Sequence, residues 1–258
     1  MSASSTGAIP TDYQPAPDLL KDRVILVTGA GSGIGRGAAL SFARHGATVI
    51  LLGRTVNRLE AVYDEIDAAG YPEAAIVPLD LQGAKQEDYE LVAERIRESF
   101  GRLDGLLHNA SLLGQLTPIE LYDAETWNKL MQVNLNGPFL LTRACIGLLR
   151  EATDASLLFT SSSVGRKGRA HWGAYSVSKF ATEGLMQVLA DELDDERHQV
   201  RVNSINPGAT RTAMRQLAYP GENPGNNPAP EDIMTPYLYL MGPDARAITG
   251  QAFDAQPK

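Results

Sequence analysis

The sequence of 258 residues contains a single cysteine, and nothing in it has the cysteine or histidine spacing of a metal site. One cysteine cannot form an internal disulfide, which is typical of proteins from a reducing compartment. Because Cys145 stands among apolar residues, we interpret it as a buried, inert thiol and not as a nucleophile. The sequence therefore predicts no metal ion and a fold that disulfides do not hold together.

Long apolar runs and a secretory signal are also missing. The longest apolar runs, such as 49–52, have the length of a strand, whereas about 20 apolar residues are needed to cross a bilayer. Residues 1–20 have neither the basic start nor the apolar centre of a signal peptide. We expect them to form a flexible N-terminal lead-in to a cytoplasmic protein that has no membrane partner.

Basic residues are scarce relative to acidic ones. The chain has 23 Lys and Arg against 31 Asp and Glu, a net charge of −8 and a pI near 5.1. Such a field repels phosphates, so we expect no nucleic-acid partner. A hydrophobic content of 43% with 21% charged residues is ordinary for a globular protein, and the length fits one domain. We expect a single domain over residues 21–258.

Short apolar runs alternate with helical patterns along that domain. The predicted strands lie near 23–28, 47–52, 74–79, 103–107, 156–161, 200–205 and 251–253. Strands that are apolar on both faces and alternate with helices are typical of a parallel sheet covered on each side. The predicted fold class is therefore α/β, a doubly wound parallel sheet of the Rossmann type with helices on both faces.

Two long helices are predicted, at about 122–150 and 174–196. Pro138 removes a backbone donor inside the first, so we expect a kink just after Asn134. Residues 220–231 are rich in proline, glycine and asparagine and predict a mobile loop. We expect a substrate loop at about 213–232.

A glycine-rich turn follows the first predicted strand. The segment from Gly29 to Gly35 leads from that strand into a helix, an arrangement that places a pyrophosphate on backbone amides at the helix N-terminus. At the end of the second strand, where an NAD site normally has an acidic residue, this chain has Arg54. A guanidinium there favours the 2′-phosphate of NADP(H), with Ser32 and Arg58 as further contacts. The alternative is that Arg54 is a solvated arginine at a strand end.

Tyr175 and Lys179 are four residues apart in a predicted helix, so they share one face. The ammonium favours the phenolate and is expected to lower the tyrosine pKa from its usual value of about 10 toward the range of a general acid or base. Ser162, selected over Ser161 and Ser163 by its spacing to Tyr175, is expected to hold a substrate oxygen beside the phenol.

With Asn109-Ala110 added to these motifs, the chain resembles the short-chain dehydrogenase/reductase family from about residue 18 to 256. The resemblance implies an NADP(H)-dependent enzyme that reversibly reduces a carbonyl to an alcohol and assembles as a homodimer or homotetramer. It also implies roles for four catalytic residues. Ser162 polarises the carbonyl and Tyr175 transfers the proton. Lys179 lowers the tyrosine pKa and binds the nicotinamide ribose, and Asn134 holds a water in the proton relay.

The same resemblance, together with the reading of Ser32 and Arg54 given above, assigns the cofactor contacts. The expected residues are Thr28, Gly29, Ser32, Gly33, Ile34, Gly35, Arg54, Asp80, Leu81, Asn109, Ala110, Tyr175, Lys179, Pro207, Gly208 and Thr212. More narrowly, residues 160–175 and the ending 253–257 are similar to the YciK-type bacterial oxidoreductases. No metal ligand is implied.

The substrate is left open by the sequence. A small carbonyl or alcohol is expected, with a 3-oxoacyl-thioester-like compound as one possibility. A wall that includes Leu112, Leu113, Trp172, Met214 and Tyr219 indicates a partly apolar ligand. The basic loop with Arg166, Lys167 and Arg169 is either solvated or binds an anionic handle of the substrate. Two alternatives remain, an NAD-linked alcohol or hydroxysteroid dehydrogenase and a non-catalytic nucleotide-sensing protein.

Overall fold

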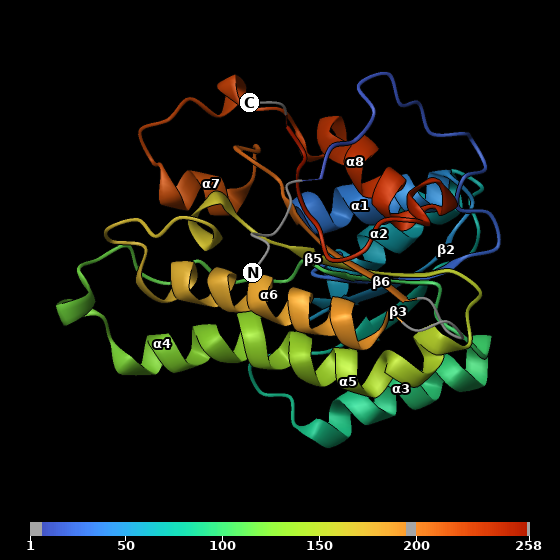
Figure 1. Ribbon diagram of the computed structural model, residues 1–258, viewed down its shortest axis with the longest axis horizontal. Coiled ribbons are helices and arrows are strands. Elements are labelled where there is room, and N and C mark those ends of the chain that lie inside the picture. Colours follow the sequence, from blue (N-terminus) through green and yellow to red (C-terminus); the bar gives the residue numbers. More distant parts are fainter. Residues whose placement is uncertain (1–6, 195–199, 257–258) are drawn as a thin grey trace.

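The computed structural model describes residues 7–194 and 200–256 (Figure 1). Seven strands form one parallel sheet in the order β3-β2-β1-β4-β5-β6-β7. Each strand lies where the sequence predicts it. The strands are β1 Val24–Thr28, β2 Thr48–Gly53, β3 Ala75–Pro78, β4 Gly105–His108, β5 Ala155–Thr160, β6 Val200–Asn206 and β7 Ala252–Asp254.

Helices cover both faces of the sheet, which confirms the doubly wound fold. One layer contains α1 Gly33–Arg44, α2 Val56–Ala68 and α8 Met234–Met241, and the opposite layer contains α3 Gln86–Phe100, α5 Gly137–Arg150 and α6 Gly173–Glu192 (Figure 1). Helix α4 Ala124–Met131 continues the line of α5, and α7 Ala213–Ala218 lies apart from both layers. No helix in the described part of the chain is long and apolar enough to span a membrane.

The core has two halves because successive strand residues point to opposite faces. In β1, Ile25 and Val27 pack with α1 residues in one apolar cluster. Leu26, which lies between them, packs in a second cluster with α3 and α5 residues. All three side chains are fully buried. Strands that are apolar on both faces are therefore the physical reason for the three-layer arrangement.

The first long helix is interrupted at the expected place. One π-helical turn, Gln132–Asn136, separates α4 from α5, and Pro138 stands in the first turn of α5. Proline has no N–H to donate to the preceding turn, and a π turn is one way in which a helix absorbs that loss. Asn134 lies in the middle of this turn. The second long helix ends earlier than predicted, at Glu192.

The expected flexible lead-in packs on the domain between residues 7 and 20, while residues 1–6 lie outside the described part, and its flexibility stays a prediction. The Gly7 N–H donates to the Ala252 carbonyl at 3.0 Å, and Tyr13 packs edge-on against Tyr239 with ring centres 4.8 Å apart. Leu20 is fully buried. This segment packs on the domain because its apolar side chains extend the core beside α8, a contact that its local sequence does not reveal.

The expected substrate loop at 213–232 also has more regular structure than predicted. It begins with α7 and contains two 3₁₀ turns, Pro224–Asn226 and Pro230–Ile233. Both turns start at a proline, whose fixed φ suits the first position of a helical turn. The prolines that predict a loop therefore also shape it.

Candidate functional site

A cleft of about 440 Å³ opens at the carboxyl ends of the strands. It includes the point where the strand order reverses between β1 and β4, the place where open α/β sheets bind their ligands. Most of the residues predicted to bind a cofactor line it. These are Gly29, Ser32, Gly33, Ile34, Arg54, Asp80, Leu81, Asn109, Ala110, Tyr175, Lys179, Pro207 and Thr212.

Three predicted cofactor residues, Thr28, Gly35 and Gly208, are not among the lining residues. The Thr28 hydroxyl accepts hydrogen bonds from the backbone N–H groups of Asn109 at 2.9 Å and Ala110 at 3.0 Å. Thr28 therefore ties the end of β1 to the segment after β4. This is a positioning contact across about 80 residues of sequence, so the motif alone does not reveal it.

The glycine turn has the shape that a pyrophosphate requires. Gly29 has a φ of 69° and Gly33 a φ of 54°, in the left-handed region that favours glycine. A Cβ atom on Gly35 would lie 2.3 Å from the Gly29 carbonyl oxygen, so only glycine allows α1 to start this close to β1. The free N–H groups at the start of α1 thus adjoin the cleft, where they suit an anion.

Positive charge gathers where β2 ends. Arg54 follows that strand directly, and Arg58 comes from the first turn of α2. Both are exposed and both line the cleft together with Ser32. Among the described residues neither arginine has an ion pair with a carboxylate, whereas Arg36 binds Glu65 and Glu231. The two guanidinium groups are therefore available to an anionic ligand.

Tyr175 and Lys179 lie on the buried face of α6, with 8% and 4% of their surfaces exposed. The Lys179 Nζ lies 5.6 Å from the centre of the Tyr175 ring and donates a hydrogen bond to the Thr160 carbonyl at 2.7 Å. Ser162 is close enough to Tyr175 to lower the pKa of its phenol, and its hydroxyl accepts from the Val164 N–H at 3.4 Å. Tyr175 and Lys179 line the cleft, whereas Ser162 does not and its neighbour Ser161 does. The catalytic roles of Ser162, Tyr175 and Lys179 stay predictions.

The protonation of the pair differs from the expectation. Burial raises the pKa of Tyr175 to about 12, and the hydrogen bond from Ser162 opposes this only in part. Burial also lowers the pKa of Lys179 to about 8, against the charge of Glu183. The predicted lowering of the tyrosine pKa is therefore wrong for this structure. The reason is desolvation, the largest effect on each group, which disfavours both the phenolate of Tyr175 and the ammonium of Lys179.

Asn134 uses its side chain to fix the segment after β4. Its Oδ1 accepts from the Leu112 N–H at 2.8 Å, and its Nδ2 donates to the Leu112 carbonyl at 2.9 Å and to the Ser178 hydroxyl at 3.1 Å. The π turn thereby connects this segment to α6. The predicted role of Asn134 in holding a water remains a prediction.

An apolar wall adjoins the phenol on its other side. The wall includes Leu112, Leu113, Trp172 and Met214, and the ring centres of Trp172 and Tyr175 are 5.8 Å apart. Tyr219 continues it at 6.0 Å from Trp172. The five residues predicted to border a substrate therefore gather near Tyr175.

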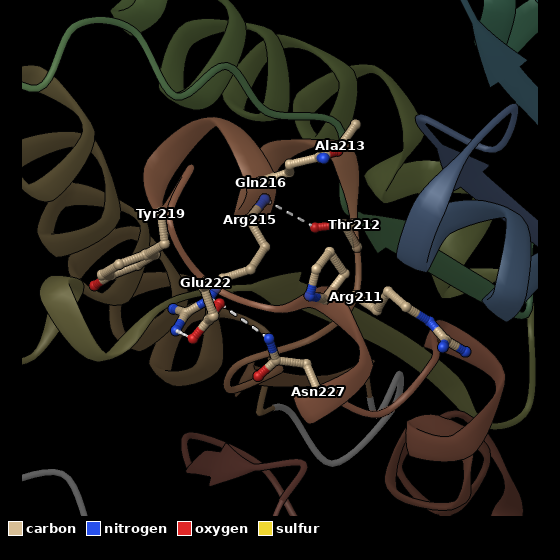
Figure 2. Close-up of a pocket in the computed structure, with 9 residues that line it drawn as sticks. Arg211, Thr212, Ala213, Arg215, Gln216, Tyr219, Glu222 and Asn227 are labelled. Carbon is tan, nitrogen blue, oxygen red and sulfur yellow. Dashed lines mark hydrogen bonds and ion pairs between the residues drawn. The ribbon is translucent and has the colours of Figure 1, made fainter.

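A second, smaller pocket of about 250 Å³ lies beside α7 (Figure 2). Arg215 points toward Glu222 and binds it with two hydrogen bonds, at 2.6 and 2.7 Å, while Asn227 donates to the same carboxylate at 3.0 Å. Thr212 lines both this pocket and the cleft. The ion pair closes the turn after α7, and sequence reasoning did not identify it because the two residues belong to different turns.

The three basic residues of the loop at 166–169 differ in their contacts. Arg166 is not available to a ligand, because it binds Asp254 at 2.8 Å and Glu183 at 3.1 Å. Arg169 donates to the Tyr219 hydroxyl at 2.7 Å and lies 5.8 Å from the centre of the Trp172 ring. Lys167 is exposed. Only Lys167 and Arg169 therefore remain candidates for contact with an anionic handle.

Within residues 7–194 and 200–256, no group of three or more His, Cys, Asp or Glu side chains is placed to hold a metal ion. Burial raises the pKa of the Cys145 thiol to about 12, which agrees with an inert cysteine. His108 is buried, pairs with the Thr142 hydroxyl at 2.7 Å and has a pKa lowered to about 3 by burial. Both residues belong to the core.

Comparison with known proteins gives consistent matches. A family model described as short chain dehydrogenase matches residues 23–223. The oxidoreductase YciK of Escherichia coli (strain K12), itself uncharacterised, is 54% identical over 245 residues, which are 95% of this chain and 96% of YciK. The similarity to YciK-type oxidoreductases is thus confirmed.

Solved structures agree with these matches. A candidate short chain dehydrogenase from Pseudomonas syringae has 61% identity and a TM-score of 0.93, covering 95% of this chain and 99% of that chain. A protein from Escherichia coli CFT073 in complex with NADPH has 54% identity and a TM-score of 0.92, covering 94% of this chain and 100% of that chain.

Proposed function

Because this chain belongs to the short chain dehydrogenase family, which makes it an oxidoreductase, we propose that it is an NADP(H)-dependent enzyme that reversibly reduces a carbonyl to an alcohol. The observation that carries the proposal is the buried Tyr175, with Ser162 and Lys179 around it, on the wall of the nucleotide cleft. A non-catalytic nucleotide-sensing protein would not need this complete set.

The residues of the cleft fit a nicotinamide dinucleotide. The glycine turn leaves room that a Cβ atom would fill, and the start of α1 offers N–H groups to a pyrophosphate. Asp80 and Leu81 are assigned to the adenine, and Asn109, Ala110, Pro207, Gly208 and Thr212 to the nicotinamide end. When bound, the reduced cofactor supplies the hydride that the carbonyl carbon accepts.

The proton steps belong to the chain itself. The Ser162 hydroxyl donates a hydrogen bond to the carbonyl oxygen as negative charge develops on it. Tyr175 then gives that oxygen its proton. Burial raises the pKa of Tyr175 to about 12, so the phenol is protonated near neutral pH and holds the proton that the carbonyl oxygen receives. Lys179 binds the ribose and favours the phenolate that remains, and Asn134 is assigned to the path that returns the proton.

Preference for NADP(H) over NAD(H) rests on Arg54, Arg58 and Ser32. A 2′-phosphate would find two unpaired guanidinium groups and a hydroxyl at the end of β2, and the position holds no carboxylate to repel it. The NADPH complex of the relative from Escherichia coli CFT073 supports this assignment. An NAD-linked alcohol or hydroxysteroid dehydrogenase is the less favoured alternative.

The substrate proposed is a small carbonyl compound with an apolar portion against Trp172 and Met214. A 3-oxoacyl thioester fits this description, with Lys167 and Arg169 near any anionic handle. The segment 213–232, which contains α7, is proposed to cover the substrate.

The enzyme is proposed to be cytoplasmic and to form a homodimer or homotetramer. The sequence has one cysteine, and its thiol is buried. Apolar side chains with about half of their surface exposed follow α5 and α6, namely Phe139, Val177, Phe180 and Val188. An exposed apolar face of this kind suits a contact between subunits.

Two measurements test the proposal. Titration of the protein with NADPH and with NADH, followed by nicotinamide fluorescence, decides the cofactor preference. A screen of aldehydes, ketones, quinones and 3-oxoacyl thioesters with NADPH then decides the activity, and the Tyr175→Phe variant serves as control. Tight NADPH binding with no turnover of any carbonyl would favour the nucleotide-sensing alternative.

A further inference from the structure

Glu183 is a buried carboxylate on the same face of α6 as the proposed catalytic residues. It follows Lys179 by four residues and Tyr175 by eight, so the three side chains stand one above another along the helix. Only 7% of its surface is exposed. Burying a carboxylate is costly unless hydrogen bonds and charges compensate it, so its partners indicate what it stabilises.

The partners of Glu183 come from three different segments. Oε1 accepts from the Ser161 hydroxyl at 2.6 Å and from the Arg166 Nε at 3.1 Å. Oε2 accepts from the Ser204 hydroxyl at 2.7 Å. The carboxylate therefore connects α6 to the residue after β5, to the turn before α6 and to the middle of β6.

These contacts converge on the residues that would act on the substrate. Ser161 is the neighbour of Ser162, and the next residue back, Thr160, offers the carbonyl that binds Lys179 at 2.7 Å. The turn that carries Arg166 rests tightly on α6, since a Cβ atom on Gly165 would lie 2.7 Å from the Lys179 Cβ. A shift of the end of β5 would move the Ser162 hydroxyl and the Thr160 carbonyl, which binds Lys179, together.

Glu183 is also the carboxylate whose negative charge acts on the Lys179 ammonium. The groups that face the ammonium are the Tyr175 ring and Glu183 from α6 and the Thr160 carbonyl from β5, with Arg166 and its partner Asp254 behind Glu183. Burial lowers the pKa of Lys179, and the charge of Glu183 opposes that effect. Removing the negative charge would make the buried ammonium easier to deprotonate.

We propose that Glu183 is a positioning residue, which holds the end of β5 that carries Ser162 and keeps the buried Lys179 in its charged form. This proposal rests on the function proposed above, in which Ser162 and Lys179 take part in carbonyl reduction. It assigns two separable duties to one side chain, a geometric one through Ser161 and Arg166 and an electrostatic one toward Lys179.

The test uses Glu183→Gln, which keeps the size of the side chain and removes its charge. We expect kcat to fall on the order of tenfold, because the reacting groups lose their alignment, with little change in the carbonyl KM. We also expect the alkaline limb of the kcat profile to move to lower pH. Glu192→Gln, on the exposed end of the same helix, is the matched control and should match the wild type.

Two further variants separate a positioning role from a purely structural one. Ser204→Ala removes one hydrogen bond to Glu183 but leaves its charge, so its pH profile should match the wild type. Glu183→Asp keeps the charge but shortens the reach, so kcat should fall while the alkaline limb stays in place. If Glu183→Gln lowers only the melting temperature and leaves kcat and the pH profile unchanged, the proposal is overturned.

A readout without substrate keeps this test independent of the proposed activity. With ¹³Cε-labelled lysine, the Lys179 signal is assigned through a Lys179→Arg variant and followed by NMR against pH. The midpoint of the Lys179 titration should move to lower pH in Glu183→Gln and stay at the wild-type pH in Glu183→Asp and Glu192→Gln. The same midpoint in Glu183→Gln and in the wild type would refute the electrostatic duty, even if no carbonyl substrate is ever turned over.

Discussion

The Lys179 ammonium lies 5.6 Å from the centre of the Tyr175 ring but gives its hydrogen bond to the Thr160 carbonyl, at 2.7 Å. The lysine is therefore bound to the end of β5, while Ser162 is the neighbour that lowers the pKa of the phenol. Burial is the largest effect on the pKa of both groups.

Replacing Tyr175 with phenylalanine removes the proposed proton donor and leaves the ring in place. We expect kcat for carbonyl reduction to fall by about 10²–10⁴-fold, the usual contribution of a positioned acid. Affinity for NADPH should change little. The control is Tyr63→Phe on α2, whose hydroxyl binds Glu73 outside the cleft. Steady-state kinetics that retain most of the wild-type kcat in Tyr175→Phe would contradict the mechanism.

The pKa of Lys179, lowered to about 8 by burial, predicts the alkaline limit of the reaction. Tyr175 stays protonated well above this pH because its pKa is raised to about 12, so the loss of rate near pH 8 should come from the lysine. We expect kcat to fall as pH rises through about 8. In Lys179→Arg the guanidinium stays charged, so the activity that remains should no longer fall as pH rises through about 8. If kcat of this variant still falls near pH 8, the fall belongs to the titration of another group.

The contribution of Lys179 to the free energy of unfolding should rise with pH, whereas its contribution to kcat should fall. Its folded pKa lies below the ordinary value of 10.5, so the unfolded chain binds more protons between about pH 8 and 10.5. This group should therefore add to the free energy of unfolding as pH rises through that window. Urea denaturation of the wild type and of Lys179→Met across the window measures the difference, and parallel curves would show no linkage.

Arg54→Ala should weaken the binding of NADPH more than the binding of NADH. Hydrogen bonds to charged groups contribute about 1.5–3 kcal/mol, so we expect the KM for NADPH to rise by about tenfold or more. The KM for NADH should change little, since that cofactor has no 2′-phosphate. Arg95→Ala, an exposed position on α3, is the control. Equal changes for both cofactors would indicate that Arg54 is only a solvated arginine.

Asp154 stabilises the fold far from the cleft. It binds the fully buried Arg201 at 2.9 Å and Arg23 at 3.2 Å. Asp154→Asn would leave a buried guanidinium without a counter-charge, and breaking such a pair costs about 3–5 kcal/mol. We expect a large drop in the urea midpoint. Asp191→Asn, exposed on α6, should leave the midpoint unchanged, and an equal effect of the two would contradict this role.

Several site residues could be predicted because their signals are local. The turn from Gly29 to Gly35 joins a strand and a helix that adjoin in sequence, and the four-residue spacing of Tyr175 and Lys179 follows from the helix period alone. Ser162 could be found because it stands at a strand end at a fixed distance before that helix. Each of these signals lies within one short stretch of chain.

The amino-acid sequence by itself determined the seven strands and their coverage by helices, since apolar periodicity and glycine positions act over short stretches of chain. The resemblance to the family supplied most of the predicted residues that line the cleft. Only the tertiary structure decided the pKa values of the site residues and the ion pairs and hydrogen bonds that fix their side chains. Arg166 is neutralised by Glu183 and Asp254, and Asn134 is bound to Leu112, through contacts across 17 to 88 residues of chain. The pKa values of Tyr175 and Lys179 likewise follow from burial, a property of the packed layers that no local pattern contains.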